Sequence, residues 1–311
     1  MVAWTWKDDF HLRESLNDIR RNLEAKRFGK TPDKVILQCL GAIIQKTAKT
    51  RDILSLKPEV VRDSIEILNN SLEKTIDFLS TELNVSSRDF LPHSHQIIPL
   101  TFFFSIVNTP NRIQSKILKQ WFWKTSFSKR YAGSTDTKVN DDIVFFQKVA
   151  SNQIGDTEKY VYTIDAADLI NQKFSISSPF TRAFLLLLAQ HNPLNLTNGN
   201  RIDLGRALSQ YNSKEYHHIF PKTFLKIHKF QTQKINSLCN FCFLPADPNK
   251  KIRTAPSDYL FKLHVHDILP EILESNLMPK NLEIYQRNQY ERFLSERARL
   301  TIKFLNKVLL K

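Results

Sequence analysis

Glycine is scarce in this chain, and that scarcity limits the folds open to it. Only 6 of the 311 residues are glycine, whereas 22 are phenylalanine. All-β proteins need many tight turns, and glycine most readily adopts the positive φ angles that such turns use. Hydrophobic residues make up 41% of the chain, and its length is enough for two ordinary domains with a real core. The sequence therefore predicts a mostly α-helical protein.

Apolar residues recur at helical spacing through the N-terminal part of the chain. The pattern is clear in residues 12–23, 36–44 and 61–83, where it marks one face of an α-helix. Thr31 followed by Pro32 predicts the start of the second helix, with threonine as the capping residue. These three faces are expected to pack in a core.

The domain boundary is expected near the middle of the chain. Residues 132–160 are polar and rich in turn-forming residues, so they predict a linker or a surface loop. We therefore expect a helical domain over 1–160 and a helix-rich domain over 161–311. In the second domain, residues 180–190 predict a buried helix, and 281–310 predict a long amphipathic helix.

The chain is strongly basic. Its 45 Lys and Arg outnumber 31 Asp and Glu, giving a net charge of +14, which suggests a polyanionic partner such as DNA. A protein that is merely basic would show the same total. Lys124, Lys129, Arg130 and Tyr131 follow an aromatic cluster at 121–123. They could hold nucleic acid, but we prefer to interpret them as a solvated basic edge beside buried aromatic residues.

The cysteines and the apolar segments indicate a cytoplasmic protein without a membrane span. An odd set of three cysteines is not a disulfide framework. Cys239 and Cys242 have the spacing of half a zinc site, but no second pair exists, so small buried residues are the preferred interpretation. The N-terminus lacks the pattern of a signal peptide, and no apolar stretch reaches the length of a bilayer.

The segment with the clearest chemical content lies in the C-terminal half. Two adjacent histidines, His217 and His218, lie in the sequence YHHIFP, whose strand character ends at Pro221. Two asparagines, Asn240 and Asn249, follow farther along the chain. A histidine pair alone is usually packing, and two asparagines alone carry no signal. Their combination with Ile-Phe-Pro indicates one functional site.

This combination resembles the HNH, or ββα-metal, nuclease fold, including the HNH domain of RNA-guided CRISPR nucleases. By that resemblance the motif spans residues 216–253. His217 is a metal ligand, His218 the general base, Asn240 the central asparagine of the hairpin loop, and Asn249 the second metal ligand. The resemblance implies one divalent metal ion and hydrolysis of DNA to 5′-phosphate and 3′-hydroxyl ends.

The residue types suit these roles. Adjacent strand residues point to opposite faces, so His217 and His218 are not expected to bind the same ion. A histidine titrates near neutral pH, as a general base should, and an asparagine that is hydrogen-bonded to an imidazole nitrogen would fix its tautomer. Aspartate often occupies the place of His217. A nitrogen ligand there shifts the preference from Mg²⁺ toward Mn²⁺ or another transition metal.

The resemblance extends to most of the chain. The segments TWKDDFHL, RFGKTPDKVILQCL, FLPHSHQIIPLTFFF and LKQWFWKTSFSKRYAGS are similar to the helical middle of GmrSD-type proteins. These are modification-dependent type IV restriction nucleases and other phage-defence enzymes that commonly end in an HNH-like domain. Their usual N-terminal domain is ParB-like and hydrolyses nucleotides, and its Asp-Gly-Gln-Gln-Arg type motif is not found here. We therefore expect that domain to be a missing part or a partner subunit.

The sequence thus predicts a metal-dependent HNH endonuclease of restriction or anti-phage defence. Four basic residues near the motif are the expected phosphate contacts: Lys222, Lys250, Lys251 and Arg253. One HNH site cuts one strand at each visit, so nicking is expected, and a double-strand break needs two nicks or a homodimer. Two alternatives stay open. The HNH element could be degenerate in a helical DNA-binding or partner-binding subunit, or the chain could be an RNase toxin of the same fold.

Overall fold

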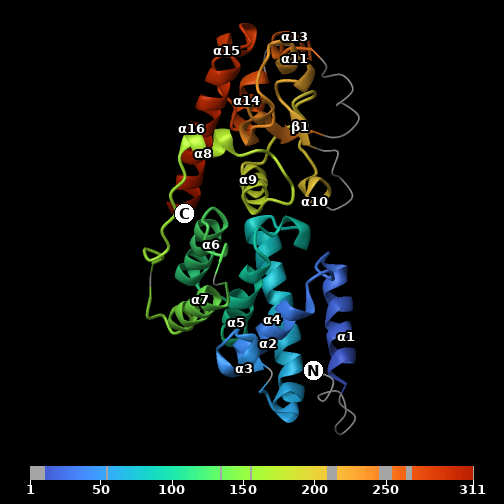
Figure 1. Ribbon diagram of the computed structural model, residues 1–311, viewed down its shortest axis with the longest axis vertical. Helices are drawn as coiled ribbons and strands as arrows, with labels where there is room; N and C mark the ends of the chain where they lie inside the picture. The colour runs from blue at the N-terminus through green and yellow to red at the C-terminus, as the bar shows by residue number, and fades with distance from the viewer. Residues whose placement is uncertain are drawn as a thin grey trace. The chain divides into compact units, whose positions relative to one another are not determined.

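The protein is mostly α-helical, as its composition predicts, and its described strands form one antiparallel pair. The chain divides into two compact units, Met1–Tyr162 and Thr163–Lys311 (Figure 1). No helix in the described part of the chain combines the length and the apolar character needed to cross a membrane. This computed structural model describes residues 11–53, 55–133, 135–154, 156–208, 216–244, 254–263 and 268–310.

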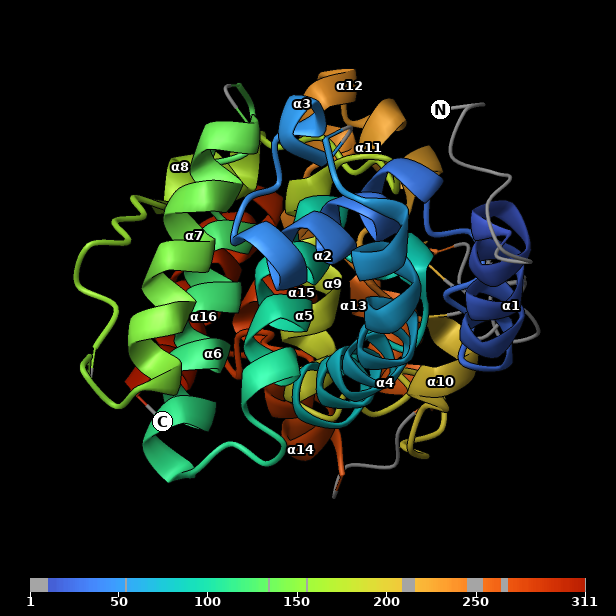
Figure 2. The same cartoon turned by 90° about the horizontal axis from the view of Figure 1, so that it is seen from below.

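The first unit is a helical bundle around α5. Eight of the residues of α5 are buried on all its sides, and the helix packs against α2, α4 and α7, which surround it in Figure 2. A helix that is apolar all round belongs in a core. The elements of this unit are α1 (Leu12–Ala25), α2 (Asp33–Gln45), α3 (Thr50–Ile53), α4 (Pro58–Leu83), η2 (Arg88–Phe90), η3 (Ser94–Gln96), α5 (Ile97–Ile106), α6 (Arg112–Ser126) and α7 (Thr135–Ala150).

The three predicted apolar faces are confirmed as helices, with one shift in a cap. α1 buries its whole predicted face and α4 most of it, whereas α2 buries Ile36, Leu37 and Leu40 but leaves Ile43 and Ile44 half-buried. However, α2 begins at Asp33 and its capping residue is Pro32, not Thr31. The hydroxyl of Thr31 donates instead to the carbonyl of Phe28 at 2.7 Å. That side chain therefore closes the preceding turn and has no part in capping the helix.

The linker predicted over 132–160 is wrong, because most of it is helix α7. This helix buries Val139, Ile143, Phe146 and Val149, which share one helical face. The polar residue Asp142 lies among them and is fully buried. A charged residue inside the apolar face hides the helical period when the sequence is analysed by hydropathy.

The region around 121–131 is more buried than a solvated edge would be. Trp121–Trp123 is buried, as predicted for a core anchor. Tyr131 is also buried, and the side chain of Arg130 is only 17% exposed because it pairs with buried Asp142. The interpretation of this segment as a solvated edge is therefore wrong for Arg130 and Tyr131.

The second unit surrounds a short hairpin with helices. The helix predicted at 180–190 is confirmed as α9, whereas the long helix predicted at 281–310 divides into α15 and α16, with Asn288 between them at a φ of 50°. The elements are α8 (Ala166–Asn171), α9 (Pro179–Gln190), α10 (Leu204–Ala207), β1 (Tyr216–His218), α11 (Lys222–Ile227), α12 (Thr232–Ile235), η5 (Leu238–Asn240), β2 (Phe241–Phe243), α13 (Pro256–Leu263), α14 (Leu269–Ser275), α15 (Glu283–Gln286) and α16 (Tyr290–Leu310).

Candidate functional site

The histidine pair lies on the first strand of the hairpin. β1 pairs antiparallel with β2, so that His217 is opposite Cys242 and His218 is opposite Phe241. The sequence predicts strand character as far as Phe220, but β1 ends at His218. The reason is that the N–H of Phe220 donates to a side chain, the Oδ1 of Asn240, at 2.8 Å. The regular ladder stops where this side chain replaces a backbone acceptor.

Asn240 holds the loop between the two strands. Its side chain is fully buried. Besides accepting from Phe220, its Nδ2 donates to the carbonyls of Phe220 at 3.1 Å and Ile235 at 3.0 Å. The backbone adds to this link, because the N–H of Ile219 donates to the carbonyl of Asn240 at 2.8 Å. Asn240 therefore ties the end of β1 to the start of β2 through main-chain groups, and no imidazole is among its contacts in the described residues.

The imidazole of His218 bonds to a different asparagine, Asn236. The Nε2 of His218 lies 3.2 Å from the Oδ1 of Asn236, and the Nδ2 of Asn236 donates to the carbonyl of Thr232 at 2.9 Å. This second bond fixes the orientation of the amide, so an oxygen faces the imidazole. An amide oxygen only accepts, so the Nε2 of neutral His218 carries the proton and its Nδ1 has the free lone pair.

The electrostatic surroundings keep His218 neutral. Burial lowers its pKa, Asn236 opposes that shift by accepting a hydrogen bond, and the charge of Lys222 lowers the pKa further. The ring also packs against Phe241, with 4.2 Å between ring centroids. His218 is therefore a neutral, oriented imidazole with a basic Nδ1.

His217 is neutral for a related reason but lacks a partner at one nitrogen. Burial and the neighbouring His218 lower its pKa to about 4. Its Nε2 is buried and makes no hydrogen bond within the described residues. Most buried polar atoms in proteins are hydrogen-bonded, so an unsatisfied imidazole nitrogen is an exception that asks for a cause. Two adjacent histidines thus differ, since one is anchored by Asn236 and the other has an unused nitrogen.

A buried arginine supports the hairpin from behind. Arg297 of α16 is fully buried, and its Nη1 donates to the carbonyls of Cys239 and Phe241, both at 2.7 Å. Its Nη2 donates to the carbonyl of Asn276 at 3.1 Å.

Burial raises the pKa of the thiols of Cys239 and Cys242 to about 12, so both are protonated, unpaired thiols, as expected for small core residues.

The remaining predicted site residues divide into one that is described and four that are not. Lys222 is exposed at the start of α11, close enough to His218 to affect its pKa. No group of three His, Cys, Asp or Glu side chains suited to a metal occurs among the described residues. Four predicted residues lie outside the described part of the chain: Asn249, Lys250, Lys251 and Arg253.

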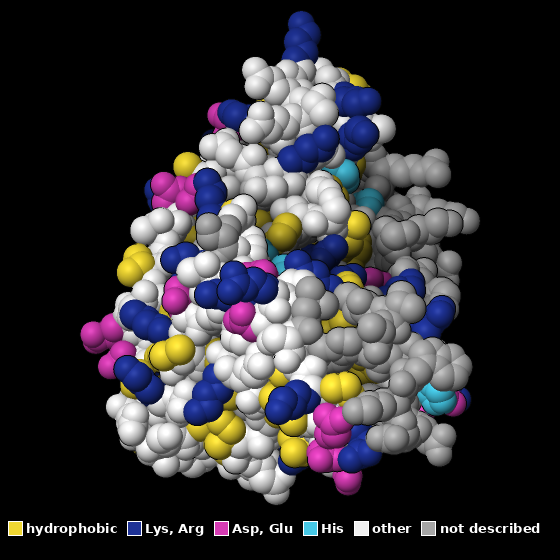
Figure 3. All heavy atoms as spheres, turned by 60° about the horizontal axis from the view of Figure 1, so that its bottom comes forward, with side chains coloured by type: hydrophobic (Ala, Val, Ile, Leu, Met, Phe, Trp, Pro, Cys, Tyr) yellow, Lys and Arg dark blue, Asp and Glu magenta, His cyan; other side chains and the backbone are white. Residues whose placement is uncertain are grey.

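Two supporting residues were missed in the sequence. Asn236 is the residue at the C-terminal end of the short helix α12, and Arg297 lies far along the chain in α16. Neither belongs to a recognisable motif. The arginine is one of many on a charged helix, and only the packing distinguishes it. On the face that Figure 3 shows, Lys and Arg side chains are spread among Asp and Glu.

Comparison with known proteins gives one distant relative. No family model matches the chain. An uncharacterized protein of Methanocaldococcus jannaschii is 26% identical to it over 255 residues, which is 77% of this chain and 42% of the relative. The chain therefore spans less than half the length of the relative that it matches.

Proposed function

We propose that this protein is a metal-dependent endonuclease of the HNH type that hydrolyses DNA, with its active site on the β1–β2 hairpin. The observation that carries this proposal is the difference between two adjacent neutral imidazoles. His218 has an anchored ring with a basic Nδ1, and His217 has a buried Nε2 without a partner in the described residues. A base and a ligand are the two roles that phosphodiester hydrolysis asks of such a pair.

His218 is the proposed general base. Its Nε2 is occupied by Asn236, so proton transfer from an attacking water falls to Nδ1. Its lowered pKa keeps that nitrogen unprotonated at neutral pH. Asn240 contributes by holding the loop, and Asn236 by holding the ring.

His217 is the proposed metal ligand. A buried imidazole nitrogen that makes no hydrogen bond within the described residues fits a position that a cation would complete. A bound Mg²⁺, Mn²⁺ or other transition metal ion would stabilise the charge that develops on the leaving oxygen. Asn249 remains the proposed second ligand, and Lys222, Lys250, Lys251 and Arg253 remain the proposed phosphate contacts.

The biological setting is proposed on the same resemblance. A type IV restriction or other anti-phage role, in the cytoplasm, would place a ParB-like nucleotide-hydrolysing domain or subunit beside this chain. One base and one metal ion make a site that cuts one strand at a time. We therefore propose nicking as the basic reaction and a homodimer as one way to reach double-strand breaks.

The test is a plasmid-cleavage time course with Mn²⁺ and with Mg²⁺. The wild type should convert supercoiled DNA to open circles before linear DNA appears. His218→Ala should reduce the rate by about a hundredfold or more, because a positioned base contributes at least that much, and should still bind DNA. His228→Ala is the matched control, since His228 is exposed just after α11, and it should cleave at the wild-type rate.

Three results would contradict this assignment. Full activity of His218→Ala would remove the general base from the hairpin. Binding of DNA without cleavage by folded wild type, with either metal, would favour a catalytically degenerate binding subunit. Cleavage of RNA in a parallel assay, with DNA left intact, would instead favour an RNase.

A further inference from the structure

The first unit contains a basic pocket that belongs to no part of the hairpin. Its volume is about 310 Å³, within the size range of small-ligand pockets. Five of its lining side chains are cations and one is a buried tyrosine: Lys124, Lys129, Arg130, Lys138, Lys159 and Tyr160. These residues come from α6, α7 and the segments that follow them. So many cations around one concave space repel one another unless an anion lies among them.

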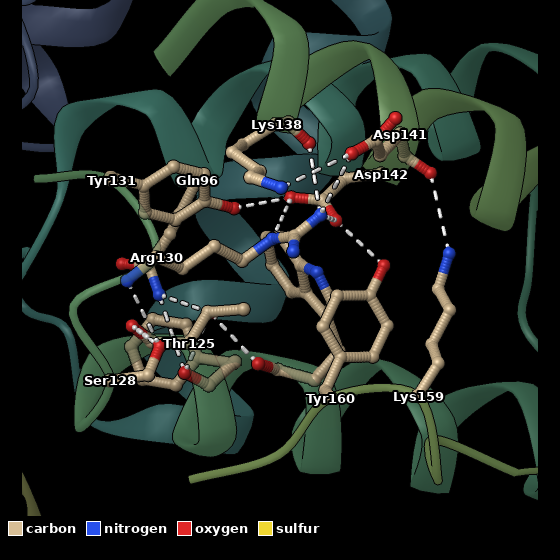
Figure 4. Close-up of polar contacts among 12 residues, drawn as sticks. Gln96, Thr125, Ser128, Arg130, Tyr131, Lys138, Asp141, Asp142, Lys159 and Tyr160 are labelled. Carbon is tan, nitrogen blue, oxygen red and sulfur yellow. Dashed lines mark hydrogen bonds and ion pairs between the residues drawn. The ribbon is translucent and has the colours of Figure 1, made fainter. Parts of the chain in front are cut away.

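Arg130 is held in the pocket wall by a carboxylate that has no acceptor sites to spare. Asp142 is fully buried, and its Oδ1 accepts from the Nη2 of Arg130 and from Tyr160, both at 2.6 Å. Its Oδ2 accepts from the Nε of Arg130 at 3.2 Å and from Tyr131 at 2.6 Å. Figure 4 shows the guanidinium between Asp142 and the ring of Tyr160. Arg130 uses its Nε and Nη2 for the bonds to Asp142, and its Nη1 makes no hydrogen bond among the described residues.

The lysines surround this fixed guanidinium. Lys124 donates to the carbonyl of Thr157 at 2.9 Å, which positions its ammonium group. Lys159 lies over the rings of Phe145 and Tyr160 at 4.4 and 4.9 Å. Burial lowers the pKa of both lysines, as expected where ammonium groups are poorly hydrated. Lys129 is exposed at the rim.

The acidic residues nearby do not fill the pocket. Asp142 is saturated, and Asp141 is half exposed, with its carboxylate 3.9 Å from both Arg130 and Lys138. Asp156 and Glu158 act on Lys124 only through longer-range attraction. None of these four carboxylates is among the residues that line the pocket. The charged side chains that line the pocket are therefore all cations.

We propose that this pocket binds a phosphate group. A phosphate offers several charged acceptor oxygens to one guanidinium and several ammonium groups, whereas a single carboxylate could use only part of this set. The phosphate can belong to a free nucleotide or to a DNA backbone, and both present the same chemistry to the pocket. This inference does not depend on the proposed activity of the hairpin.

The experiment measures binding by the full chain without added metal and with a chelator present, at fixed ionic strength. The probes are thymidine 5′-monophosphate, thymidine as its phosphate-free counterpart, inorganic phosphate and a DNA duplex of fixed length. The test variant is Lys129→Gln/Lys138→Gln. The control is Lys57→Gln/Lys74→Gln, which removes the same charge from the same unit at residues that do not line the pocket.

We expect the test variant to lose about tenfold or more of the affinity for the phosphate-bearing probes, which is the size of a charge-assisted contact. The control should change that affinity less than twofold, and thymidine should not bind. Loss confined to the monophosphate and inorganic phosphate would identify a free ligand, and loss confined to the duplex would identify the backbone.

Equal losses in the test and control variants would overturn the proposal, because they would indicate diffuse charge and no pocket. Absence of measurable binding by the wild type to every phosphate-bearing probe would also overturn it. A circular dichroism melt of each variant distinguishes these results from a failure to fold.

Discussion

Two clusters of buried polar groups, one around Asp142 in the first unit and one around the hairpin of the second, are satisfied to different degrees. In the first unit, Asp142 accepts four hydrogen bonds from Arg130, Tyr131 and Tyr160. In the hairpin of the second unit, the Nε2 of His217 and the Nε of Arg297 are buried without partners in the described residues. Arg130 and Arg297 are the arginines of these two clusters, and among the described residues only Arg130 has a carboxylate paired with it.

This difference indicates that the Asp142 cluster mainly stabilises the fold and that the hairpin is the region available for binding and chemistry. A fully satisfied buried network specifies one packing and stabilises it. An unsatisfied group costs free energy in folding, and such costs persist mainly where a function needs the group. The Asp142 cluster is thus expected to stabilise its unit, and it also fixes the wall of the basic pocket. A ligand bound at the hairpin would restore the missing interactions there.

The largest effect should come from breaking the satisfied network. Asp142→Leu should lower the free energy of unfolding by about 3–5 kcal/mol, because it leaves Arg130 and two tyrosine hydroxyls buried without their acceptor. Urea denaturation measures this change. Asp141→Leu is the matched control on the same helix. Its carboxylate is 51% exposed, so we expect a change within about 0.5 kcal/mol. Similar losses in both variants would mean that the network does not hold the unit together.

Sequence analysis captured the parts of the fold that follow a simple period. The faces of α1 and α4 obey the helical spacing and are buried, so hydropathy was sufficient. It failed for α7, because Asp142 lies in the apolar face and its burial is explained only by its partners Arg130, Tyr131 and Tyr160 outside the helix. A polar core residue is satisfied by tertiary contacts, which local patterns do not contain.

The same limit applies to the candidate site. Local order along the chain placed His217 and His218 on a strand and Asn240 at the loop. It predicted that an asparagine would orient an imidazole but did not identify Asn236, which reaches His218 only through the path of α12 and η5. It missed Arg297, whose carbonyl partners are set by packing.

A smaller effect should appear in the hairpin as acid sensitivity. His217 has a pKa of about 4 in the folded protein, below its ordinary value of 6.5. The unfolded chain therefore binds more protons between these values, so the contribution of His217 to stability is complete above pH 6.5 and is lost as the pH falls toward 4. The loss amounts to about 3 kcal/mol. His218 adds a loss of the same sign.

His217→Phe tests that contribution by urea denaturation at a series of pH values. The variant should lose less free energy of unfolding on acidification than the wild type. At pH 7 it should be no less stable, because the substitution removes an unsatisfied buried nitrogen. The control His228→Phe should keep the wild-type acid dependence. A variant with the full dependence would mean that His217 titrates freely, and the contrast with the Asp142 cluster would then fail.

The smallest effect concerns Asn236, the one polar partner that an imidazole of the hairpin has among the described residues. Asn236→Ala removes the acceptor that holds the proton on the Nε2 of His218, so neutral His218 would populate both tautomers and its ring would turn more freely. We expect cleavage to slow by about tenfold, the usual scale for residues that orient a functional imidazole.

Asn236→Asp should act differently, because a carboxylate at this place favours the charged imidazole and raises the pKa of His218. The acid limb of the pH–rate profile should then move to higher pH, whereas Asn236→Ala should lower the plateau with little movement of the limb. A purely structural role for Asn236 would slow both variants without moving the limb in either, and that result would leave His218 without the positioning residue proposed for it.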